Sequence, residues 1–137
     1  MKFTNKEINC VPPELRYEIF RSTQDDMLHR DPHFDKWMNF AVVDCLPYLY
    51  FLQYKTYGHL QRHQDQQHAL TNLIRTIVTK EDLYHRETAL NILGQCMEQE
   101  NRSQDALQCY MLSLEHRAKN NVAIYHICIL LSRSLAD

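Results

Sequence analysis

The stretch that decides the fold is Thr88–Lys119, TALNILGQCMEQENRSQDALQCYMLSLEHRAK. Apolar residues recur at helical spacing on both sides of a polar run around Asn101, so the sequence predicts two amphipathic helices joined by a short turn. Gly94 lies inside the first predicted helix, where glycine costs up to about 1 kcal/mol relative to alanine. This cost indicates that a neighbouring helix approaches the backbone there. Ala106 supplies a matching small residue on the second predicted helix.

The order of large and small residues in this helix pair resembles the tetratricopeptide repeat. The positions that carry the resemblance are Leu90, Leu93, Gly94, Met97, Ala106, Tyr110 and Ser113. In that family, helix pairs of 34 residues stack into a solenoid, because one pair cannot bury its apolar face alone. The concave surface of the solenoid binds other proteins.

Further copies are indicated on both sides of this pair. Gly58 precedes Gly94 by 36 positions and Ala69 precedes Ala106 by 37, which resembles an irregular earlier copy. Counting 34 positions forward from the first helix predicts the opening helix of an incomplete third copy, with Ile124, Ile127 and Leu131. The resemblance therefore implies an all-α, tetratricopeptide-like α-solenoid of about seven helices. We expect one domain, residues 1–137, with N-terminal capping helices in 1–45 and repeats in 46–137.

Helix signals divide the rest of the chain. Pro12–Pro13 predicts the start of a first helix, because proline suits the opening turn. Asp31–Pro32 predicts a second helix that runs to Cys45. The polar residues 63–67 are expected to form a turn, and Thr79–Asp82 resembles a capping box that starts the fifth helix. Asn120–Asn121 is expected to cap the last helix.

Composition narrows the possible functions. The formal net charge of −2 over 137 residues provides no positive field for a phosphate backbone, which disfavours nucleic-acid binding. The longest apolar run, residues 122–131, is too short to cross a bilayer. Five cysteines without CxxC spacing indicate free, mostly buried thiols, and the first ten residues lack the apolar stretch of a signal peptide. We expect an intracellular protein, cytoplasmic or nuclear.

The resemblance implies a peptide-binding groove on the first helix of each copy. The corresponding positions are Lys55, His59, Arg62, His63, Asn91, Gln95, Gln99 and Tyr125. Amide side chains can donate and accept hydrogen bonds with an extended peptide. We therefore expect a non-catalytic scaffold or adaptor that binds a protein or peptide partner. The simpler alternative is an ordinary solvated helix face.

Some members of the family clamp a carboxylate with lysine, asparagine and arginine, and only Lys55 occupies such a position here. A chaperone-tail ligand is therefore disfavoured. His59 and His63 share a helical face at metal-ligand spacing, which leaves a metal-binding or enzyme-associated bundle as an alternative. A structural subunit of a larger complex is a second alternative. The chain has no recognisable catalytic motif and no cofactor fingerprint, and with two glycines it cannot build a glycine-rich phosphate loop.

The C-terminal helix is apolar on nearly every side from Val122 to Leu131. Such a helix is expected to have neighbours on more than one side, whereas the end of a solenoid is expected to be polar. The chain therefore continues in a longer protein, the helix folds inward, or it pairs with another chain. The residues that would form such an interface, with a second copy or a partner helix, are Ile124, Ile127, Ile129 and Leu130.

Overall fold

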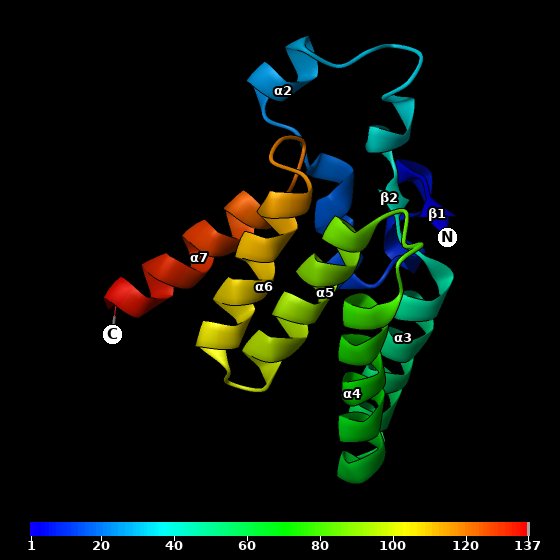
Figure 1. Ribbon diagram of the computed structural model, residues 1–137, viewed down its shortest axis with the longest axis vertical. Helices are drawn as coiled ribbons and strands as arrows, with labels where there is room; N and C mark the ends of the chain where they lie inside the picture. The colour runs from blue at the N-terminus through cyan, green and yellow to red at the C-terminus, as the bar shows by residue number, and fades with distance from the viewer. Residues whose placement is uncertain (137) are drawn as a thin grey trace.

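The computed structural model describes residues 1–136, which are mostly helical, as expected for the all-α class (Figure 1). The α-helices are α1 Pro13–Arg16, α2 Gln24–Leu28, α3 Cys45–His59, α4 His63–Thr79, α5 Arg86–Gln99, α6 Ser103–His116 and α7 Ala123–Ala136. Short 3₁₀ helices cover Asn5–Cys10, Tyr17–Phe20 and Lys36–Asn39. Two strands, β1 Lys2–Phe3 and β2 Ala41–Val42, pair antiparallel.

The body of the molecule is built from two helical hairpins followed by a single helix. α3 packs on α4 and α5 packs on α6, while α7 packs on α6 and projects from the end of the row (Figure 1). Each hairpin turns through one residue in the left-handed region, Gln61 at φ 57° and Asn101 at φ 58°. An arginine then pairs with an aspartate in the first turn of the next helix, Arg62 with Asp65 and Arg102 with Asp105.

These matching corners lie 40 positions apart, so the predicted register of the first copy is wrong. At this spacing, Tyr54 and not Gly58 is the counterpart of Gly94. Tyr54 is large and buried, so the first hairpin has no close approach at that point. The spacing between the two corners is set by α4, which spans 17 residues, by residues 80–85 and by α5.

The predicted amphipathic pair 88–119 forms as α5 and α6. α5 is buried along most of its length, because α6, α4, α3 and α1 all contact it. A side chain at Gly94 would collide with Tyr110: a Cβ there would lie 2.7 Å from Cζ of that ring. The atoms nearest to the position of that Cβ all belong to the Tyr110 ring, and Ala106, the expected small partner of Gly94, is fully buried.

The helix predicted for Asp31–Cys45 is wrong. Oδ1 of Asp31 accepts hydrogen bonds from the amides of His33 and Phe34, but the turn that it stabilises does not continue as an α-helix. The segment instead reaches β2, where Ala41 pairs with Phe3 across the two-stranded sheet. Burial of Ala41 and the neighbouring Val43 against the helices outweighs local helix propensity there.

Other predicted boundaries are also corrected. Residues 63–67 form the first turn of α4, not a loop, and the short α2 forms in the polar segment after Thr23. Thr79 ends α4, and α5 begins only at Arg86. The carboxylate of Asp44 accepts hydrogen bonds from the amides of Tyr84 and His85, and so fixes the two residues before α5 from about 40 positions earlier in the chain. A local sequence pattern cannot reveal a contact of this kind.

Two further findings concern cysteines and hydropathy. All five cysteines are free, but only Cys96 and Cys109 are buried, which corrects the expectation of mostly buried thiols. Among residues 1–136, no helix combines the length and the apolar character needed to span a bilayer.

Candidate interaction groove

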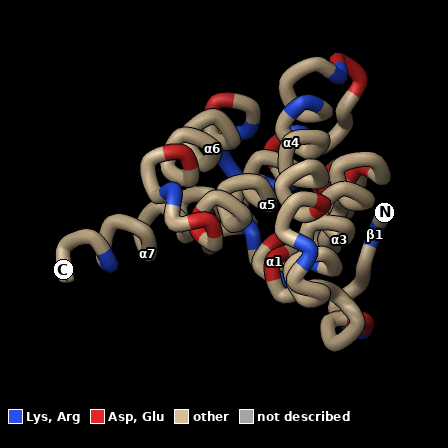
Figure 2. The backbone as a smooth tube through the Cα atoms, turned by 90° about the horizontal axis from the view of Figure 1, so that it is seen from below, with Lys and Arg blue, Asp and Glu red and all other residues tan. Residues whose placement is uncertain are grey.

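The predicted binding face is largely occupied by the chain's own N-terminal segment. Nζ of Lys55 on α3 lies 2.8 Å from the carboxylate of Glu14, and Nε2 of Gln95 on α5 donates to the carbonyl oxygen of Glu14 at 2.9 Å. Nδ2 of Asn91 donates to Oε1 of Glu18 at 3.0 Å. The α1–Phe20 segment, hereafter the N-terminal strap (Pro13–Phe20), therefore lies across α3 and α5 (Figure 2).

The third helix of the predicted face also contacts this strap. The ring of Tyr125 on α7 lies 5.6 Å from that of Tyr17, measured between centroids. Four of the eight predicted groove residues thus converge on one segment: Lys55, Asn91, Gln95 and Tyr125. Asn91 is fully buried, so it binds the strap and is not available to a partner.

The other four predicted groove residues remain exposed. His59, Arg62 and His63 lie at the α3–α4 corner, and Arg62 pairs with Asp65 at 2.6 Å. Gln99 lies at the end of α5, where it lines an open cleft. The structure therefore separates the basic corner from the amide-lined part of the face.

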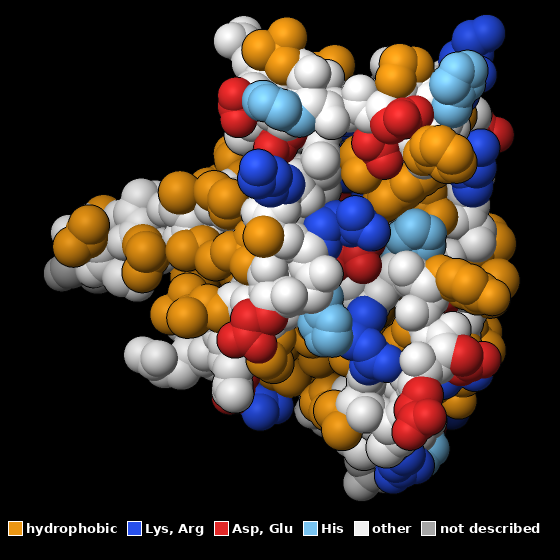
Figure 3. Space-filling model, turned by 45° about the horizontal axis from the view of Figure 1, so that its top comes forward, with side chains coloured by type: hydrophobic (Ala, Val, Ile, Leu, Met, Phe, Trp, Pro, Cys, Tyr) orange, Lys and Arg blue, Asp and Glu red, His pale blue; other side chains and the backbone are white. Residues whose placement is uncertain are grey.

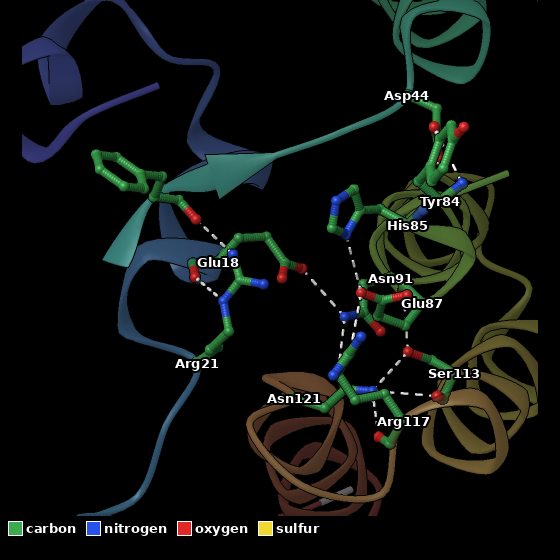
Figure 4. A network of polar contacts seen from close by, with 11 residues as sticks. Glu18, Arg21, Asp44, Tyr84, His85, Glu87, Asn91, Ser113, Arg117 and Asn121 are labelled. Atoms are coloured by element: carbon green, nitrogen blue, oxygen red, sulfur yellow. Dashed lines mark hydrogen bonds and ion pairs between the residues drawn. The ribbon is translucent and has the colours of Figure 1, made fainter. Parts of the chain in front are cut away.

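A buried polar network anchors the strap to α5, α6 and the start of α7 (Figure 4). Asn91 donates to Glu18 and also to Oδ1 of Asn121, each at 3.0 Å. Asn121 donates to Oγ of Ser113 at 2.9 Å, and Ser113 donates to the carbonyl oxygen of Glu87 at 2.9 Å. The chain of bonds links the strap to three helical segments at once.

A second branch of the network surrounds the carboxylate of Glu87. Nε of Arg117 lies 3.2 Å from Oε1 of Glu87, and Nδ1 of His85 lies 3.3 Å from the same atom. Arg117 and Arg21 also approach the ring of Trp37, at 4.9 and 4.8 Å from its centroid. Trp37 therefore fixes the segment before β2 against the network through cation–π contacts.

The two network carboxylates have different electrostatic environments. Burial raises the pKa of Glu18, and the nearby guanidinium of Arg21 opposes that shift. For Glu87, burial also favours the neutral form, but hydrogen bonding from His85 and the charge of Arg117 outweigh it, so the pKa of Glu87 is lowered. Both carboxylates are nearly inaccessible to solvent, which favours a structural role over acid–base catalysis.

Beyond the strap, the face continues as an open cleft of about 240 Å³ between α5 and α7. Its lining residues are Pro13, Glu14, Tyr17, Gln95, Glu98, Gln99, His126, Ile129 and Arg133. The cleft combines carboxylates, amides, an arginine and an apolar side chain. Such a surface can bond a peptide backbone and accept one side chain.

His126 is the unusual residue of this cleft. It is 6% exposed, its ring stacks on that of Tyr110 at 5.0 Å, and Nε2 has no hydrogen-bond partner among residues 1–136. Burial lowers the pKa of His126 to about 4, so the ring is neutral at physiological pH. Nε2 itself is shielded from solvent, so His126 is a packing residue in the wall of the cleft.

The sequence patterns missed several residues of this site. Glu14, Tyr17, Glu18 and His126 were not predicted as site residues, although the charged Glu18 beside apolar Ile19 on a predicted apolar stripe was an available signal. Pairing between the strap and helices 40 to 110 positions later leaves no local trace.

The two buried thiols lie in surroundings that favour their neutral form. Burial raises the pKa of Cys109 to about 11 and that of Cys96 further, so both thiols are protonated at neutral pH. Within the described residues, 1–136, no group of three or more histidine, cysteine, aspartate or glutamate side chains could hold a metal ion.

No protein-family model matches the chain, and no curated protein or solved structure matches it either. The assignment of a role to the groove therefore depends on its geometry.

Proposed function

We propose that this chain is a non-catalytic protein-interaction scaffold of the tetratricopeptide-like class, which binds a peptide segment of a partner on its α3–α5–α7 face. The observation that carries the proposal is the binding of the strap. This face already holds a short helical segment through a carboxylate, a backbone carbonyl and an aromatic ring, and the adjoining cleft remains open.

The strap indicates what kind of ligand suits the face. Its contacts use groups that any peptide has, the backbone carbonyl of Glu14 among them. The open cleft offers the same kind of chemistry from Gln99, Glu98 and Arg133, next to the apolar side chain of Ile129. A peptide that places one aliphatic or aromatic side chain against Ile129, with its backbone bonded to these polar groups, fits this arrangement.

The class assignment is supported by the middle hairpin. Its spacing from Gly94 to Tyr110 and Ser113 places a small residue against a large ring between two helices of 14 residues each. The 40-residue spacing of the hairpin corners departs from the family's 34 residues, so the first hairpin belongs to this class only as an irregular copy.

A displayed library of random dodecapeptides tests the proposal. Peptides selected on the whole chain are labelled, and their affinity is measured by fluorescence anisotropy. Ile129→Glu places a charge in the cleft and should weaken selected peptides by about tenfold or more. The matched control is Gln64→Ala, an exposed change on α4, which should leave affinity unchanged. Peptides that bind both variants as tightly as the parent chain would show that the cleft is not the binding site.

A further inference from the structure

α7 has a solvent-exposed apolar face in addition to its buried face. Ala123, His126 and Leu130 are buried, whereas Ile124 is 49%, Leu131 47% and Leu135 88% exposed. Cys128 is exposed between them. These four exposed positions, 124, 128, 131 and 135, are hereafter the α7 stripe. Figure 3 shows hydrophobic side chains along the α7 arm at the left of the view.

The spacing of the stripe is that of a helix–helix seam. Successive members are four, three and four positions apart, which keeps them on one side of a helix over about one and a half heptads. The corresponding face of α5, 34 positions earlier, carries Leu90, Gly94 and Met97, which are buried beneath α6 or its neighbours. The stripe therefore has the pattern of a helix-packing face but no helix of residues 1–136 covers it.

The charge distribution favours a second copy of this chain as the occupant. No residue from Val122 to Ser132 carries a formal charge, and the flanks of the stripe are Tyr125, Ile127, Ser132 and Ser134. Arg133 is directed towards Glu98, at 3.4 Å, on the other side of the helix. Two copies can therefore approach about a twofold axis without placing like charges opposite each other.

The order of side chains is complementary to itself when the two helices run antiparallel. With the axis midway between positions 129 and 130, Ile124 lies opposite Leu135 of the second copy, and Cys128 lies opposite Leu131. Each pair of facing residues then combines an a position of one helix with a d position of the other, as antiparallel coiled coils require. Parallel helices would instead place each residue opposite itself, including Cys128 opposite Cys128.

The region around Ile124 provides a site for the most exposed side chain of the stripe. An apolar groove of about 470 Å³ lies beside it, between the end of the strap and the start of α7, and Phe20, Val122 and Tyr125 contribute to its lining. Phe20 is 65% exposed there. Leu135 of the second copy, opposite Ile124, would lie at this groove. Because the two copies are related by a twofold axis, the same contact would form twice in the dimer.

We propose that α7 is a self-association surface, which pairs antiparallel with α7 of a second copy through the α7 stripe. The surface is separate from the cleft, because Ile129 and His126, which line the cleft, lie on other sides of α7. Self-association and peptide binding can therefore succeed or fail independently.

Multi-angle light scattering of the full chain over a range of concentrations tests the surface. We expect a concentration-dependent dimer, and Leu135→Glu should raise its dissociation constant by about tenfold or more. The control is Val78→Glu, an exposed apolar position on α4, which should leave the dimer intact. Both positions are exposed, so both variants should keep the circular dichroism spectrum of the parent. A folded parent chain that stays monomeric at every concentration, or a dimer insensitive to Leu135→Glu, overturns the proposal.

Cysteine crosslinking tests the register. In a chain with Cys10→Ser, Cys45→Ser and Cys128→Ala, the pair Ile124→Cys and Leu135→Cys should form a covalent dimer on mild oxidation, because the two positions face each other across the axis. They lie 11 positions apart on one helix, about 16 Å, too far for a disulfide within one chain. Each single substitution should give no disulfide dimer. Dimers formed by the single substitutions would overturn the antiparallel register.

Discussion

The ammonium group of Lys55 lies 2.8 Å from the carboxylate of Glu14, 41 positions earlier in the chain, and both side chains are largely buried. The sequence predicts that Lys55 lines a groove for a partner peptide. Lys55 binds an acidic residue of its own chain instead. This contact holds the strap on the α3–α5–α7 face, and it supports the proposal that the face binds a peptide segment of a partner.

Charge reversal at Lys55 should destabilise the fold. Lys55→Glu would place two carboxylates together in a partly buried site, and we expect it to lower the free energy of unfolding by about 1–3 kcal/mol. Arg62→Glu is the matched change, because the Arg62–Asp65 pair is exposed and should be worth less than about 1 kcal/mol. Urea denaturation of both variants is the measurement. Equal effects would show that the strap is not held by this ion pair.

The two glycines should respond oppositely to alanine. Gly94→Ala would force a Cβ against the Tyr110 ring and should cost about 1–3 kcal/mol. At Gly58, a Cβ would meet only the end of the flexible Gln66 side chain. Gly58→Ala should therefore be neutral or stabilise the helix by up to about 1 kcal/mol. Thermal melts compare the two, and a Gly94→Ala variant as stable as the parent would contradict the close packing of α5 on α6.

Asn91 should contribute to stability through the buried network. Asn91→Ala removes the donor to both Glu18 and Asn121 and leaves a buried carboxylate without that bond, at a cost of about 2–3 kcal/mol. Gln99→Ala, on the exposed end of the same helix, should change stability by less than about 0.5 kcal/mol. Chemical denaturation distinguishes them. If Asn91 instead acts as a ligand-binding residue on the surface, its replacement should be as mild as that of Gln99.

His126 should make the fold sensitive to acid. Its pKa of about 4 in the folded chain is below the usual 6.5, so between these values the unfolded chain binds a proton that the folded chain does not. This difference removes up to about 1.4 kcal/mol of stability per pH unit as the pH falls from about 6.5 to about 4, and has no effect above that range.

The measurement is the free energy of unfolding of the parent and of His126→Phe at several pH values. The variant keeps an aromatic ring on Tyr110 without a titrating group, so its stability should rise relative to the parent as the pH falls below 6.5. His126→Gln should show the same relative trend from a lower starting stability. Curves for both variants that run parallel to that of the parent would contradict the assigned pKa.

Sequence patterns predicted the elements that depend on local periodicity. α5 and α6 lie where the residues around Gly94 and Ala106 placed them, and Pro13 opens α1 as its fixed φ allows. The exposed apolar face of α7 was also indicated, because a helix that is apolar on nearly every side needs more than one neighbour. Of the four predicted interface residues, Ile124 is exposed, Ile127 and Ile129 are half-buried, and Leu130 is buried in the core.

The candidate site was predicted only in part. The face was identified from spacing, and half of its residues do converge. The N-terminal strap that occupies the face was not predicted, because the contacts of Glu14 and Glu18 with α3 and α5 join segments that no short-range pattern connects. Similarly, Asp44 bonds the residues that precede α5, and the β1–β2 pair joins residues 2–3 to 41–42.

By itself, the sequence determined the helical class, the α5–α6 pair and the unusual apolarity of the last helix. These properties follow from side-chain periodicity and backbone preference, which act over a few residues. Only the tertiary structure decided that the strap lies on the predicted groove, that the corners repeat at 40 residues and that one side of α7 remains open. Burial and long-range hydrogen bonding decide these features, since they depend on which surfaces meet after the helices have formed.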